Sequence, residues 1–168
     1  SQIAQGMFPD DQAYWQYWQK SVFEPIGVNS GTFATDTLGT WVGGSYVWAN
    51  TGDWAKLGQL MLNDGSWNSA QVVPKGWWKL AGTPAMPDGE GHGYGAQTWM
   101  PGQPVGGECN SDPGVPADTL SMEGHYGQLV AMVPSKKAVI VRLGWTIDKT
   151  QFDSCKLISD VLANLPAK

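Results

Sequence analysis

The sequence has few charges, few cysteines and histidines, and no long apolar run. Charged residues make up 15% of its 168 residues and the net charge is −5, whereas nucleic acids and anionic membranes require clustered lysine and arginine. We therefore expect neither as a partner. No apolar stretch approaches the roughly 20 residues of a membrane-spanning helix. His92 and His125 are the only histidines, and no Cys/His cluster has metal-ligand spacing. We therefore expect no metal and no cofactor.

The two cysteines leave two interpretations open. Cys109 lies in a loop rich in Gly, Pro and Asp, and Cys155 lies on an expected helix. A disulfide between them would suit a periplasmic or secreted protein. The alternative is two unpaired thiols, one of them buried. Because the chain begins at Ser1 and not at Met, we expect processing or truncation upstream, where any targeting segment would lie.

Helices are predicted in four places. Apolar residues at helical spacing indicate helices over about 10–22 and 51–62, a short helix from Pro74, and a last helix over about 149–164. Pro25 should end the first helix, because proline has no N–H and its ring clashes with the preceding turn. The second helix has the clearest ends, with Asn50 or Thr51 as its cap and Asn63-Asp64-Gly65 after it.

Strands are expected mainly in the second half of the chain. Gly91–Met100 resembles a strand, and the apolar runs Leu129–Val133 and Ala138–Leu143 predict a β-hairpin around a turn at Pro134–Lys137. A further short strand is expected near Tyr46–Trp48, inside a long polar loop.

The order of these elements predicts the fold class. Helices come first, then three strands, then a helix, which favours an α+β fold with an antiparallel sheet flanked by helices. We expect one domain over 1–168. Its first part, 1–90, is mainly helical, and its second part, 91–168, carries the sheet strands and the C-terminal helix.

A search for catalytic motifs leaves one candidate. The sequence contains no G-x-S-x-G, no Ser-x-x-Lys, no glycine-rich phosphate loop and no compelling pair of acidic residues. His125 is the best candidate for chemistry, because it lies among glycines in Gly124–Gln128, where a substrate can approach the backbone closely. The alternative is a structural histidine beside a strand.

Short segments along nearly the whole chain resemble one enzyme family. They are Phe23–Val28 (FEPIGV), Gly52–Gly58 (GDWAKLG), Asp64–Trp77 (DGSW…VPKGW), Tyr94–Trp99 (YG…W) and Gly124–Gln128 (GHYGQ). In this order they resemble the C-terminal portion of the β-lactamase-related serine hydrolases. That family includes class C β-lactamases, D-alanyl-D-alanine carboxypeptidases, esterases and 6-aminohexanoate-oligomer hydrolases. The resemblance implies a β-lactamase/transpeptidase-like fold without its N-terminal part.

The resemblance also implies catalytic roles. In that family a Lys-Thr-Gly or His-x-Gly triplet on the inner strand lines the site opposite the nucleophile. His125, Tyr126 and Gly127 would occupy the triplet, and the N–H of Gln128 would contribute to an oxyanion hole. A neutral histidine lacks the charge that attracts a β-lactam carboxylate, so an ester, amide or peptide is the favoured substrate.

Substrate contacts are expected from aromatic residues. By the same resemblance Tyr126, Trp99 and Tyr46 would border the cleft. The high tryptophan count has a plainer interpretation as core packing, which we expect for Trp15, Trp18, Trp54, Trp77 and Trp78. Trp41, Trp48 and Trp67 lie in expected loops and could instead stack on sugars.

The family's nucleophile is missing from this chain. Its Ser-x-x-Lys and its activating tyrosine lie upstream of the matching segments, and nucleophilic attack needs serine and base in contact. We therefore expect the chain alone to be inactive. Its partner would be the missing N-terminal portion, on the same polypeptide or on a second chain. The competing hypotheses are a non-catalytic Trp-rich module that binds glycan or cell-wall material, and an inactive member of the family.

Overall fold

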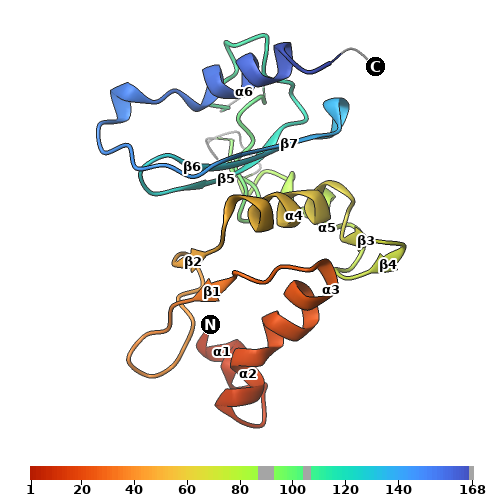
Figure 1. Ribbon diagram of the computed structural model, residues 1–168, viewed down its shortest axis with the longest axis vertical. Coiled ribbons are helices and arrows are strands. Elements are labelled where there is room, and N and C mark those ends of the chain that lie inside the picture. Colours follow the sequence, from red (N-terminus) through yellow and green to blue (C-terminus); the bar gives the residue numbers. More distant parts are fainter. Residues whose placement is uncertain (87–92, 104–106, 167–168) are drawn as a thin grey trace.

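The computed structural model describes residues 1–86, 93–103 and 107–166 (Figure 1). The first half carries α1 (Gln2–Gln5), α2 (Asp11–Trp18), a π-helical turn (Gln19–Phe23), α3 (Glu24–Ile26), β1 (Thr32–Phe33), β2 (Val47–Trp48), α4 (Thr51–Leu62), β3 (Ser66–Trp67), β4 (Ala70–Gln71) and α5 (Trp77–Ala81). The second half carries β5 (Leu120–Gly124), β6 (Gln128–Val133), β7 (Ala138–Arg142) and α6 (Ser154–Ala163), with short 3₁₀ turns at Pro134–Lys136 and Lys149–Gln151.

The largest sheet is antiparallel, with the strand order β5-β6-β7. Helix α6 covers one of its faces and α4 covers the other (Figure 1). On the central strand, Leu129, Ala131 and Val133 belong to the core under α6, and Met132 belongs to a core on the opposite side. Both faces are buried, which explains why β6 is apolar at successive positions and does not alternate with polar residues.

Helix α4 contacts the sheet through Gly58, at a point that leaves no space for a side chain. A Cβ atom on Gly58 would lie 2.6 Å from Cγ1 of Val139 and 3.1 Å from Cγ1 of Val130. The mixed architecture and the antiparallel pairing agree with the α+β expectation.

The first long helix extends past its predicted end. It continues through Pro25 as α3 and ends at Gly27, whose φ of 69° lies in the left-handed region. Proline is tolerated there because it occupies the first turn of α3, directly after a π-helical turn. The N–H of Val28 donates to the carbonyl of Phe23 at 2.9 Å and closes the helix end.

The strand predicted at Gly91–Met100 is wrong over its described part, 93–100. The N–H of Gly95 donates to the carbonyl of Thr98 at 2.8 Å, and Gln97 has a φ of 65°. The segment therefore folds back on itself. It makes only isolated bridges, one of which joins Trp99 to Ser121. The third strand of the sheet is instead β5.

Two helices begin later than predicted, because acidic side chains cap them. The carboxylate of Asp64 accepts hydrogen bonds from the N–H groups of Gly76 (2.8 Å) and Trp78 (2.9 Å), so α5 starts at Trp77. Asp153 accepts from the N–H of Lys156 at 2.9 Å and starts α6. The second helix, α4, has the predicted ends, with Asn50 as its cap.

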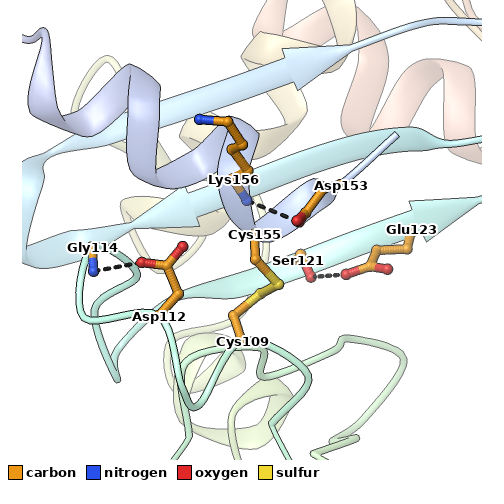
Figure 2. The surroundings of a disulfide bond; sticks show 8 residues. All are labelled: Cys109, Asp112, Gly114, Ser121, Glu123, Asp153, Cys155 and Lys156. Carbon is orange, nitrogen blue, oxygen red and sulfur yellow. Dashed lines mark hydrogen bonds between the residues drawn. A yellow bond between two sulfur atoms is a disulfide. The ribbon is translucent and has the colours of Figure 1, made fainter. Parts of the chain in front are cut away.

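Cys109 and Cys155 form a disulfide, which confirms the first of the two cysteine interpretations. It joins the loop before β5 to the first turn of α6 (Figure 2). Cys109 is buried in the core under α6. None of the helices in the described ranges is long and apolar enough to cross a membrane.

The core-packing prediction for tryptophan is wrong at three positions. Trp15, Trp18 and Trp77 are 46%, 40% and 39% exposed. The buried aromatic residue of α2 is Tyr14, whose ring stacks on Trp41 with centroids 4.2 Å apart.

Candidate functional site

His125, Tyr126 and Gly127 form the turn between β5 and β6. Gly124 ends β5 and Gln128 begins β6, and these two residues face each other across the ladder. The motif Gly124–Gln128 was expected to begin the inner strand. In the structure β6 begins only at Gln128, and residues 125–127 form the turn before it. The turn is tight because Tyr126 and Gly127 both have positive φ values, 60° and 81°.

The side chain of Arg142, the only arginine of the chain, contacts this turn. Arg142 ends β7 opposite Leu129, which places it beside the turn. Its Nη1 donates to the carbonyl of Gly127, and its Nη2 donates to Oγ1 of Thr146 at 2.6 Å. The guanidinium also lies over the ring of Phe152, 3.9 Å from its centroid.

The side chain of Gln128 connects the same two segments. Its Oε1 accepts from the N–H of Gly144 at 3.0 Å, and its Nε2 donates to the carbonyls of Gly144 and His125. The N–H of Thr146 donates to the carbonyl of Tyr126 at 3.1 Å. The segment after β7 is therefore fixed against the turn by both backbone and side-chain hydrogen bonds.

An exposed row of rings lies on this junction. The rings of His125 and Tyr126 have centroids 3.8 Å apart, and those of Tyr126 and Trp145 lie 4.7 Å apart. His125 is exposed, and Trp145 is 75% exposed. Tyr126 is half-buried between these two rings, so the imidazole and the indole are the exposed members of the row.

The backbone N–H groups along β5 point alternately toward β6 and toward the outer edge of the sheet. Ser121 exchanges both of its backbone hydrogen bonds with Trp99, on the side away from β6. Bonded and non-bonded pairs alternate along an antiparallel ladder, so the Gly124–Gln128 pair belongs to the bonded set. The N–H of Gln128 therefore points at Gly124, whereas the N–H of Glu123 points to the outer edge of β5.

One carboxyl group lies next to the turn. Glu123 accepts a hydrogen bond from the hydroxyl of Ser121 at 2.8 Å (Figure 2). Desolvation raises the pKa of the Glu123 carboxyl above its ordinary value, and the Ser121 hydrogen bond opposes that effect.

The structure does not bring the other two predicted substrate contacts to the turn. Trp99 is 39% exposed and pairs with Ser121, three residues or roughly 10 Å along β5 from Gly124. Tyr46 is 59% exposed and its ring packs at a tilt against that of Trp48 in β2. Within the described ranges, no hydrogen bond or ring contact joins either residue to the turn. His92 lies outside the described residues.

Arg142 and Trp145 are the residues at this junction that the sequence reasoning missed. A lone arginine at the end of an apolar strand was the available signal, since the hairpin turn already places residue 142 opposite residue 129. In the part of the chain that the structure describes, no group of acidic, histidine or cysteine side chains could hold a metal ion.

Comparisons with known proteins bear on the fold. No protein-family model matches the chain, and no curated protein matches it. Among solved structures, it is similar to a Bacillus anthracis protein provisionally assigned as a 6-aminohexanoate-dimer hydrolase, with a TM-score of 0.64 and 22% identity. The match covers 88% of this chain and 36% of that one, so the chain spans about a third of its length. The chain therefore shares the fold of about a third of that protein.

Proposed function

We propose that this chain is the C-terminal portion of a serine hydrolase that cleaves an amide or ester through an acyl-serine intermediate. The observation that carries the proposal is the shared fold, which extends over 88% of the chain. The sequence holds no Ser-x-x-Lys, so the nucleophile and its base come from the rest of the fold, on the same polypeptide or a second chain.

Exposed apolar side chains support a missing partner. Ile3, Met7, Leu38 and Ile147 are 89%, 81%, 70% and 68% exposed. An interface with the rest of the fold would remove apolar side chains of this kind from water, which is favourable. The disulfide favours an oxidising compartment, and we propose a periplasmic or secreted location.

In this proposal the turn forms the wall of the site opposite the nucleophile. His125 binds the substrate or positions a base, and its exposure in the turn makes both roles accessible. Gly127 lets the turn close, because its φ of 81° suits glycine. An oxyanion donor must point at the acyl oxygen. The N–H of Gln128 already points at Gly124 in the β5–β6 ladder, so it can bind the acyl oxygen only if it is shared between the two acceptors. The N–H of Glu123, which points to the outer edge of β5, is the alternative oxyanion donor.

We expect His125→Ala to reduce turnover without unfolding the protein. The change is made in the polypeptide that carries the missing part, and hydrolysis of p-nitrophenyl acetate and the thermal midpoint are both measured. Turnover should fall by roughly 10²-fold or more, as when a group that transfers or orients a proton is removed. The thermal midpoint should hardly change, because an exposed turn residue contributes little to stability.

The matched control is Trp48→Ala, which removes an exposed aromatic ring away from the turn. It should leave turnover unchanged. If His125→Ala lowers turnover and thermal midpoint in parallel, His125 is structural and its assigned role is wrong.

One observation favours a second function. Tyr46 and Trp48 are both exposed, and their rings pack with centroids 5.7 Å apart. Such a pair offers flat faces for sugars, as a module that binds glycan or cell-wall material would require. That hypothesis predicts that Trp48→Ala abolishes retention on insoluble peptidoglycan, and that no serine of the complete polypeptide reacts with a fluorophosphonate.

A further inference from the structure

We propose that Arg142 is a positioning residue, which fixes the His125–Gly127 turn and the Trp145 ring in the one arrangement that a substrate can use. The proposal rests on the proposed function, because it assumes that the turn lines a hydrolytic site. It adds the segment 142–146, which was not among the predicted site residues.

The guanidinium is suited to this task by its shape. Its two Nη atoms donate to acceptors on different segments, the carbonyl of Gly127 in the turn and the hydroxyl of Thr146 after β7. The ring of Phe152 lies against its face. A planar fork that is held on one face by an aromatic ring loses little entropy on binding two acceptors, and lysine cannot reproduce that geometry.

The turn needs such a support because its backbone is unfavourable. Tyr126, which is not glycine, has a φ of 60°, a conformation that costs free energy unless surrounding contacts impose it. A Cβ atom on Gly127 would lie 2.7 Å from Nη1 of Arg142 and 2.9 Å from Cδ1 of Phe152. The turn, the arginine and the ring are therefore packed together with no space for a side chain at position 127.

The same contacts also fix the aromatic row. Trp145 lies between two hydrogen-bonded residues. Gly144 donates to the side chain of Gln128, which follows the turn, and Thr146 donates to the carbonyl of Tyr126 in the turn. Arg142 bonds to Thr146 directly. Loss of the guanidinium would free Thr146 from one of its contacts and let the indole ring move relative to Tyr126.

The first test is structural and does not depend on activity. Amide hydrogen exchange is measured on the polypeptide that carries the missing part, comparing wild type with Arg142→Gln and Arg142→Lys. We expect exchange at Gly144 and Thr146 to accelerate by roughly 10-fold or more in both variants. The N–H of Thr146 donates to Tyr126 in the turn, and the N–H of Gly144 donates to the side chain of Gln128 directly after it. Unchanged exchange at both amides would overturn the proposal.

The matched control is Lys156→Gln on α6. This variant also removes one positive charge, together with an exposed ion pair to Asp160. It should not affect exchange at the turn. Acceleration by Lys156→Gln equal to that of Arg142→Gln would show an effect of net charge and would also overturn the proposal.

The second test is kinetic. With p-nitrophenyl acetate, kcat of Arg142→Gln should fall by about 10²-fold, the loss expected when a site is displaced by about 1 Å, while the thermal midpoint falls by only a few degrees. Arg142→Lys should not restore kcat, and added guanidinium at millimolar concentration should restore part of it. An unchanged kcat, or losses in kcat and thermal midpoint that run in parallel without rescue, would contradict a positioning role.

If wild type itself neither hydrolyses the ester nor reacts with a fluorophosphonate, the proposed function fails, and the exchange result still decides whether Arg142 fixes the turn.

Discussion

Replacing Cys109 and Cys155 together by serine should lower the free energy of unfolding by about 4 kcal/mol. The two residues lie 46 positions apart, and the estimate is the entropy that the unfolded chain regains when a loop of that length opens. Urea denaturation followed by circular dichroism measures the change. Wild type reduced with dithiothreitol should unfold at the same urea concentration as the double variant.

The disulfide should also help to hold α6 against the sheet. Cys155 lies in the first turn of α6, and Cys109 packs in the core between α6 and the sheet. Without the bond, α6 is held by packing alone, and the sheet face it covers carries buried residues such as Leu129 and Ala131. A change below about 1 kcal/mol would mean that the loop and helix hold each other without the crosslink.

Asp53→Asn should produce the second large loss, and the loss should depend on pH. The carboxylate accepts hydrogen bonds from the N–H of Asn29 (3.0 Å) and from the N–H and hydroxyl of Ser30 (2.9 and 2.7 Å), and it pairs with Lys56 at 2.7 Å. These contacts, the Lys56 bond foremost, hold the pKa of Asp53 well below its ordinary range. At neutral pH we expect the variant's thermal midpoint to fall by several degrees, because the amide cannot accept all of these bonds.

The sign of the pH dependence follows from the lowered pKa of Asp53. The stability it contributes is complete above the ordinary carboxyl pKa of about 4, and it is lost as the pH falls through that value toward the lower pKa of the folded state. The difference in thermal midpoint between wild type and variant should therefore shrink between about pH 4 and pH 2. Asp160→Asn is the control, since Asp160 forms an exposed pair with Lys156, and its effect should be small throughout. A gap that stays constant in acid would contradict the account.

Much of the fold could be predicted because its signals are local. The cap at Asn50 and the turn at Asn63–Gly65 set the ends of α4, and the turn at Pro134–Lys137 between two apolar runs sets the β6–β7 hairpin. The end of α3 could not be predicted, because it depends on a π-helical turn that accommodates Pro25. The start of α5 could not be predicted either, because Asp64 caps it from 12 residues away.

Strand β5 was not predicted, and a strand was expected at Gly91–Met100 in its place. Leu120 and Met122 alternate with Ser121 and Glu123, which is a strand pattern, but it follows a loop rich in proline and glycine and is only a few residues long. The segment at 93–100 has more aromatic residues and attracted the prediction, although its backbone reverses at Gln97.

The candidate site was predicted only where it is contiguous. Residues 125–128 were identified from one motif, and the structure shows that three of them form a turn and not a strand. Arg142 could not be given a role, because its partners Gly127 and Phe152 lie on two other segments. Contacts of this kind follow from the register of the hairpin and the path of the chain into α6, neither of which a single motif contains.

Fluorophosphonate labelling tests most directly the claim that this chain is one part of a serine hydrolase. The polypeptide that carries the missing part is treated with the probe, and the modified residue is located by mass spectrometry. The account predicts that a single serine outside residues 1–168 is modified, in parallel with loss of ester hydrolysis, and that the 168-residue chain alone is not modified. Modification of no serine in the complete polypeptide, or of a serine within residues 1–168, would contradict it.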